Sequence, residues 1–71
     1  MITITLNGQI KKINSNDIEK YSIENLINDL LLKKETIVAE LNGEIIESAK
    51  FIETYLVKDD SLELIRFVGG G

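Results

Sequence analysis

Hydrophobic and polar residues alternate over the first positions of the chain. Ile2, Ile4 and Leu6 fall on one side of an extended backbone, and threonines occupy the positions between them. Alternation with period two, carried by β-branched residues, is typical of a strand that is buried on one face. We therefore expect a strand over residues 1–7.

A tight turn is predicted directly after this strand. Asn7-Gly8 is the dipeptide best suited to the positive φ angles of a two-residue hairpin turn. The return strand is expected over 9–13, with Ile10 as its apolar anchor and Ile13 near its end. The first two strands should thus form an antiparallel hairpin.

The apolar spacing becomes helical after a polar loop over 15–20. Positions i, i+3, i+4, i+7 and i+8 form one buried stripe of a helix. Ser22 is a suitable N-cap, with Tyr21 and Leu26 as a hydrophobic staple, but Asn25 replaces the usual Glu, so a full capping box is not expected. The stripe expected to face the sheet consists of Ile23, Leu26, Ile27, Leu30 and Leu31.

The second half of the chain predicts further strands joined by turns. In order, we expect a strand over 36–41, a turn at Asn42-Gly43, a strand over 44–46, a short helix or single turns over 48–56, a turn over 58–61 and a strand over 62–68. A right-handed crossover would place the last strand centrally, parallel to the first. This order predicts an α+β, β-grasp (ubiquitin-like) fold: a mixed sheet of about four to five strands, with one main helix packed across one face.

Composition restricts the chemistry of the chain. The 71 residues suit one domain, expected over 1–68, followed by a tail over 69–71. There is no Cys and no His, which excludes disulfides, zinc sites of the usual ligands, and Cys or His nucleophiles. The exposed carboxylates form no catalytic constellation. We therefore expect a protein that is not an enzyme and that binds no metal or cofactor of its own.

Charge and hydropathy restrict the partners. The net charge is −4 and the isoelectric point is near 4.6, whereas phosphate neutralisation by nucleic-acid-binding proteins needs the opposite sign. The basic doublets Lys11-Lys12 and Lys33-Lys34 are interpreted as solvated surface. No apolar run approaches the roughly 20 residues of a membrane span. We expect a cytoplasmic protein that contacts neither nucleic acid nor membrane.

Three glycines follow the last predicted strand without a polar linker. Gly69, Gly70 and Gly71 add no side-chain contacts, so we expect a thin, flexible thread with a terminal carboxylate. Such a thread fits a narrow channel in another protein, where any side chain would collide with the walls. The alternative is a frayed end without function.

Three segments together resemble the ThiS family, the sulfur carrier proteins of thiamine biosynthesis. They are the start over 1–8, the stretch over 38–46 around Asn42-Gly43, and the ending over 62–71. The resemblance covers the whole chain and is most specific at the glycine ending. Two departures concern local loop geometry: Glu47 and Phe51 replace a Pro and an aromatic, often Trp, of many relatives, and Asp59-Asp60-Ser61 replaces the usual Asp-Gly-Asp.

The resemblance implies a specific chemistry at Gly71. A ThiF-like, E1-type enzyme would use ATP with magnesium to adenylate its carboxylate. Sulfur from a cysteine desulfurase or another donor would displace AMP to give a thiocarboxylate, and a ThiG-like thiazole synthase would take that sulfur into the thiazole ring. The alternatives are the small subunit of molybdopterin synthase, a ubiquitin-like protein modifier, and an interaction module with an idle tail.

The last strand also predicts a surface for docking to such a partner. Leu62 and Leu64 should point into the core, and Glu63, Ile65 and Phe67 should point away from the helix. We expect Ile65 and Phe67 to anchor the activating enzyme while the tail enters its channel. Glu63 and Arg66 would add orientation at the rim.

Overall fold

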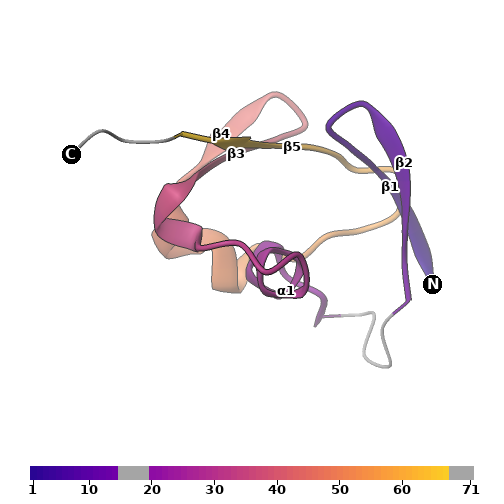
Figure 1. Ribbon diagram of the computed structural model, residues 1–71. Helices are drawn as coiled ribbons and strands as arrows, with labels where there is room; N and C mark the ends of the chain where they lie inside the picture. Colours follow the sequence, from indigo (N-terminus) through magenta and orange to yellow (C-terminus); the bar gives the residue numbers. More distant parts are fainter. Residues whose placement is uncertain (15–19, 68–71) are drawn as a thin grey trace.

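The computed structural model describes residues 1–14 and 20–67. Its elements are β1 (Ile2–Leu6), β2 (Gln9–Ile13), α1 (Ile23–Asp29), the 3₁₀ helix η2 (Lys34–Thr36), β3 (Ile37–Leu41), β4 (Glu44–Ile46), the 3₁₀ helix η3 (Ser48–Glu53) and β5 (Ser61–Arg66). Within the described residues, five strands form one mixed sheet in the order β2-β1-β5-β3-β4, and α1 crosses one face of it (Figure 1). The predicted β-grasp fold is confirmed. The predicted domain boundary at residue 68 and the tail over 69–71 lie outside the described residues.

Strand β5 occupies the centre of the sheet, as predicted. It runs parallel to β1, with Leu6 opposite Leu62, and antiparallel to β3, from Leu41 opposite Leu62 to Ile37 opposite Arg66. The last strand is therefore paired with β3 along most of its length and with β1 at its start, over Ser61 and Leu62.

Both Asn-Gly turns form as predicted, and both also hold β5. Asn7 and Asn42 have φ angles of 50° and 52°, and the glycines that follow have 81° and 87°, which is the left-handed region of a type I′ hairpin turn. The Leu64 N–H donates a hydrogen bond of 2.8 Å to Asn7 Oδ1, and the Ser61 N–H donates one of 2.8 Å to Asn42 Oδ1. Each asparagine thus forms its own turn and also binds the backbone of the central strand.

The buried carboxylate of Asp60 fixes the entry into β5. Asp60 is only 8% exposed. Its Oδ2 accepts a hydrogen bond of 2.8 Å from the Val57 N–H, and its Oδ1 accepts one of 3.0 Å from Asn42 Nδ2. Because a buried carboxylate is stable only when its oxygens have partners, these contacts hold the 57–60 turn against the β3–β4 turn.

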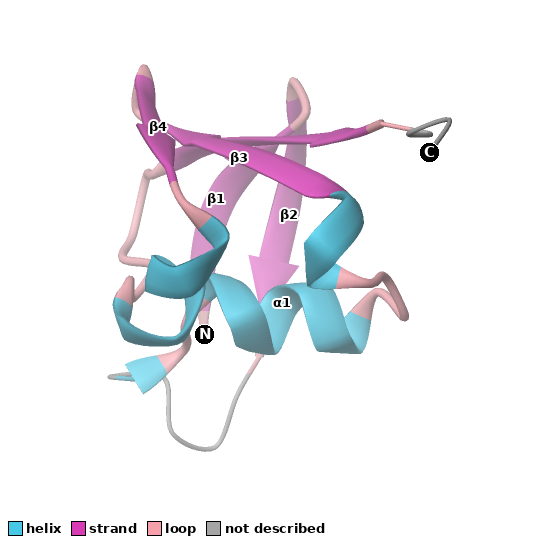
Figure 2. Ribbon diagram, turned by 90° about the vertical axis from the view of Figure 1, so that its left-hand side faces the viewer, coloured by secondary structure: helices cyan, strands magenta, loops and turns pink. Residues whose placement is uncertain are grey.

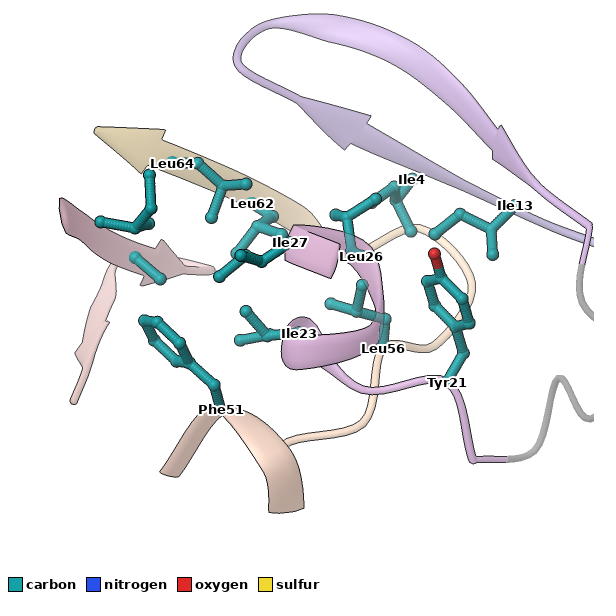
Figure 3. Close-up of a cluster of buried hydrophobic side chains, with 12 residues drawn as sticks. Ile4, Ile13, Tyr21, Ile23, Leu26, Ile27, Phe51, Leu56, Leu62 and Leu64 are labelled. Atoms are coloured by element: carbon teal, nitrogen blue, oxygen red, sulfur yellow. The ribbon is translucent and has the colours of Figure 1, made fainter. Parts of the chain in front are cut away.

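The core lies between the sheet and α1 (Figure 3). Helix α1 contributes Ile23, Leu26 and Ile27, and each is 0% exposed. Phe51 from η3 is also 0% exposed and closes the side of the core away from the sheet. The buried apolar residues are Ile4, Ile13, Tyr21, Ile23, Leu26, Ile27, Ile37, Ala39, Phe51, Leu56, Leu62 and Leu64.

Helix α1 begins with a capping box that the sequence did not predict. The Ser22 hydroxyl oxygen accepts a hydrogen bond of 3.1 Å from the Asn25 N–H. The Asn25 side-chain oxygen accepts one of 2.9 Å from the Ser22 N–H. The expectation that Asn25 could not complete the box is wrong, because its amide oxygen performs the reciprocal bond usually made by Glu or Gln.

The helix ends two residues earlier than its apolar stripe predicted. α1 stops at Asp29, and Leu31 has a φ of +60°. The Leu31 N–H donates to the Asn28 carbonyl and the Leu32 N–H donates to the Ile27 carbonyl, each at 3.0 Å, which is the Schellman arrangement that glycine usually completes. Leu31 is 90% exposed, so its predicted place in the core is wrong. Leu30 is only partly buried.

Three other apolar residues lie outside the core. Ile10 was predicted to anchor β2 but is 76% exposed. It pairs with Thr5, so both point away from the helix, while Ile13 faces inward opposite Ile2. In η3 and the segment that follows, Ile52 is 61% exposed and Tyr55 is 46% exposed. The predicted short helix or single turns over 48–56 are confirmed by η3, and within this segment Phe51 and Leu56 are the apolar residues that enter the core.

A hydrogen bond between Tyr21 and Asp29 spans the length of α1. The buried Tyr21 hydroxyl donates to Asp29 Oδ2. Burial, and secondly this hydrogen bond to a carboxylate, raise the pKa of Tyr21 well above its ordinary value. A raised pKa means that the folded state favours the protonated phenol, so this stabilisation is complete below the unfolded pKa of about 10 and is lost as the pH rises toward the folded value.

We expect Tyr21→Phe to lower the free energy of unfolding by about 1–2 kcal/mol at neutral pH, because Asp29 loses its donor. The variant should also lose part of the alkaline decline in stability above about pH 10. Urea unfolding at several pH values measures both effects. Tyr55→Phe, which removes an exposed hydroxyl, is the control and should alter neutral stability little. Parallel alkaline profiles for wild type and Tyr21→Phe would contradict the assignment.

Candidate partner-docking site

The two faces of β5 differ completely in their surroundings. Leu62 and Leu64 are 0% and 9% exposed and point toward α1. Glu63, Ile65 and Phe67 occupy the alternate positions and are exposed, with values of 50% for Ile65 and 48% for Phe67. The predicted orientation of these five residues is confirmed. The docking role of the outward three remains a prediction.

Arg66 lies apart from the other predicted docking residues. Directly opposite residues of paired strands share a face, and Arg66 is opposite Ile37. Ile37 is 5% exposed in the core, so Arg66 is on the helix side of the sheet, although it is itself exposed. The structure therefore separates Arg66 from Glu63, Ile65 and Phe67.

Strands β3 and β4 supply further residues to the outer face. Val38 is opposite Ile65, and Glu40 is opposite Glu63. Ile45 of β4 is opposite Glu40 and is 60% exposed. We call the set Val38, Glu40, Ile45, Glu63, Ile65 and Phe67 the outer patch.

The outer patch is open among the described residues. Figure 2 shows α1 and both 3₁₀ helices on the opposite side of the sheet. The Phe67 N–H donates a hydrogen bond of 3.1 Å to the Thr36 carbonyl, which extends the β3–β5 pairing to the last described residue. The patch thus ends where the sequence continues into 68–71.

Charged side chains in the described part of the chain form few pairs. Lys34 Nζ lies 2.9 Å from Glu24 Oε1, and Lys50 Nζ lies 3.6 Å from Glu53 Oε1. The hydrogen bond that Lys34 donates to the Glu24 carboxylate raises the pKa of Lys34. Over 1–14 and 20–67, no group of three or more acidic side chains is placed to hold a metal ion. No helix in the same residues has the length and apolar character to cross a membrane.

Comparison with models of known protein families gives a match that covers nearly the whole chain. The ThiS family model matches residues 4–71. The chain belongs to the ThiS family. This confirms the resemblance drawn from the sequence, and the match includes the three glycines that the structure does not describe.

Individual relatives and solved structures match this chain over nearly its full length. The crystal structure of the thiamine biosynthesis protein ThiS from Geobacter metallireducens has a TM-score of 0.80 at 30% identity, covering 99% of this chain and 100% of that one. Its solution structure gives a TM-score of 0.76 at 30% identity, covering 99% and 88%. The uncharacterized protein ycf40 is 34% identical in Porphyra purpurea and 36% identical in Pyropia yezoensis, covering 99% of this chain and 93% of each relative.

Proposed function

We propose that this ThiS-family chain is a sulfur carrier of thiamine biosynthesis and not an enzyme. The observation that carries the proposal is the family match through Gly71, together with a fold that superposes on ThiS over the whole of both chains. A carrier of this kind needs a folded domain that a partner can bind and an end that the partner can modify. The open outer patch, directly before the glycines, supports the first requirement.

The proposed reaction takes place at the Gly71 carboxylate. A ThiF-like enzyme transfers AMP from ATP to this carboxylate and releases pyrophosphate, since a carboxylate is a poor acyl donor and a mixed anhydride is a good one. Persulfide sulfur from a cysteine desulfurase then attacks the acyl carbon, AMP leaves, and a thiol reductant cleaves the resulting acyl disulfide, so that a thiocarboxylate remains. A donor that supplies sulfide would displace AMP and give the thiocarboxylate directly. A ThiG-like thiazole synthase accepts this sulfur. The partners bring ATP, magnesium and nucleophiles, and this chain brings the acyl group.

Mass spectrometry tests the proposed function. The chain is incubated with the ThiF-like enzyme of the same organism, ATP, magnesium and a sulfur donor. We expect its mass to rise by the difference between one sulfur and one oxygen, and the product to support thiazole formation by the ThiG-like synthase. Branched conjugates to lysine would indicate a protein modifier. Sulfur transfer to molybdopterin synthase, but not to thiazole synthase, would indicate the molybdenum-cofactor pathway.

Phe67 provides a test of the outer patch as the docking surface. Burying a whole Phe side chain contributes about 1.5–3 kcal/mol, and about half of Phe67 is still exposed. We expect Phe67→Ala to raise the Kd for the activating enzyme about three- to tenfold. The melting temperature should change little, because the lost atoms lie outside the core.

Ile52→Ala is the matched control for this test. Ile52 is apolar and 61% exposed, but it belongs to η3, on the opposite side of the sheet. Its truncation should leave the Kd unchanged. Equal Kd values for Phe67→Ala and the wild type would show that the enzyme docks elsewhere, and unfolding of Phe67→Ala would place Phe67 in the core.

A further inference from the structure

Two negatively charged side chains lie next to each other in the outer patch. Glu40 and Glu63 are directly opposite in the antiparallel β3–β5 pair, and residues in this relation have Cβ atoms only about 4.5–5.5 Å apart. Both point away from α1, because their neighbours Ala39, Leu62 and Leu64 are buried on the helix side. Like charges at such positions destabilise a sheet.

Within the described residues, neither Glu40 nor Glu63 forms an ion pair. The ion pairs found there join Lys34 to Glu24 and Lys50 to Glu53, away from the outer patch. Arg66 is near in sequence but lies on the helix side of the sheet, opposite Ile37.

Apolar residues flank the pair on two sides. Ile45 lies beside Glu40 on β4, and the Val38–Ile65 pair is the next outward pair along the two strands. Ile45 and Ile65 are 60% and 50% exposed, so a partner surface that covers them would also remove water from the two carboxylates. A desolvated pair of like charges is strongly unfavourable unless the partner brings a cation.

We propose that the Glu40–Glu63 pair receives a cationic side chain, an arginine or a lysine, from the activating enzyme that docks on the outer patch. This inference rests on the proposed function and adds the chemistry of the partner. The apolar residues supply contact area, and the two carboxylates select a partner with a positive charge at one position. An arginine suits this position best, because its planar fork can donate to both carboxylates at once. The net charge of −4 steers the chain toward such a basic surface.

Glutamine substitution tests the proposal, because Gln keeps the shape of Glu and removes its charge. The Kd of the activating enzyme is measured without ATP, so that binding is separated from adenylation. We expect Glu40→Gln and Glu63→Gln each to raise the Kd about threefold, and the double variant to raise it about tenfold. The dependence of the Kd on salt should weaken in the same order.

A stability measurement distinguishes docking from a structural role. Each single variant relieves the repulsion, so its Tm should rise by about 1–5 °C while its binding weakens. Glu40→Lys should stabilise the chain further, by placing opposite charges across the strands, and should weaken binding more than Gln does. If Glu40 and Glu63 had a merely structural role, their substitution would lower both the Tm of the chain and its affinity for the enzyme.

Glu44→Gln is the matched control. Glu44 is exposed on β4 and carries the same charge, but it is opposite Leu41 on the helix side of the sheet. Its substitution should change neither the Kd nor the salt dependence. If Glu44→Gln and Glu40→Gln had equal effects on the Kd, the weaker binding would follow from the change in net charge alone. This result would overturn the proposal.

Two further outcomes would also overturn it. The first is unchanged binding in the Glu40→Gln, Glu63→Gln double variant. The second is a rise in Tm on addition of Mg²⁺ or Ca²⁺ that the wild type shows and the double variant lacks, because a metal ion would then occupy the pair. Either result leaves the sulfur-carrier function intact, since thiocarboxylate formation at saturating enzyme tests that function separately.

Discussion

A chain that lacks Gly70 and Gly71 is expected to keep its melting temperature and to lose all detectable ATP–pyrophosphate exchange with the activating enzyme. Stability should be unaffected because glycines contribute no side chain to a core. Exchange should disappear because the proposed acceptor, the carboxylate of Gly71, is gone, and the shortened end cannot reach the same position in a channel. Gly71→Phe should have the same effect, since a bulky side chain would collide with the channel walls.

The truncated chain also provides its own control. Its outer patch is intact, so it should still bind the enzyme and compete with the wild-type chain in the exchange reaction. Competition without exchange would separate docking from chemistry. Full exchange activity in the truncated chain would refute the sulfur-carrier proposal.

Truncation of Leu26 should have the largest effect on stability among three leucines that follow one another along α1 and its end. Leu26 is 0% exposed, and removing a fully buried leucine side chain costs about 2–5 kcal/mol. Small domains have total stabilities of about 5–15 kcal/mol, so Leu26→Ala should bring the chain close to unfolding. Urea denaturation measures the change.

Leu30→Ala and Leu31→Ala are the matched controls, with identical chemistry in different surroundings. Leu30 is partly buried, so Leu30→Ala should lower the free energy of unfolding less than Leu26→Ala does. Leu31 is 90% exposed, so its truncation should change the free energy of unfolding by less than about 0.5 kcal/mol. A similar loss for Leu31 and Leu26 would show that the helix presents a different face to the sheet.

Local signals predicted most of the fold. The alternation over 1–7 and the two Asn-Gly dipeptides set the conformation of their own residues, so the hairpins could be located from sequence. The end of α1 could not be predicted in this way, because apolar spacing continues to Leu31 while the backbone reverses into a Schellman turn. Ile10 was misplaced because Ile10 and Ile13 lie on opposite faces of β2, and the pairing with β1 turns Ile13 and not Ile10 toward the core.

The docking surface was predicted on one strand only. Alternation along β5 is enough to place Glu63, Ile65 and Phe67 together, because each strand turns every second side chain to the same face. To place Glu40 and Val38 beside these residues, one must know the register between β3 and β5, which pairs residues more than 20 positions apart. Their outward positions on the predicted third strand were the available signal. Arg66 was grouped by nearness in sequence, and the same alternation places it on the other side.

The central position of β5 has a mechanical consequence. A partner that binds the segment after Phe67 would pull along the axis of a central strand that is paired with β3 along most of its length and with β1 at its start. Force in that direction loads the hydrogen bonds in shear, so many must break together, whereas an edge strand can be peeled away one bond at a time. The side chains of Asn7 and Asn42 add two further bonds to β5. We therefore expect that the proposed activating enzyme could pull on the residues after Phe67 and release them again without unfolding the domain.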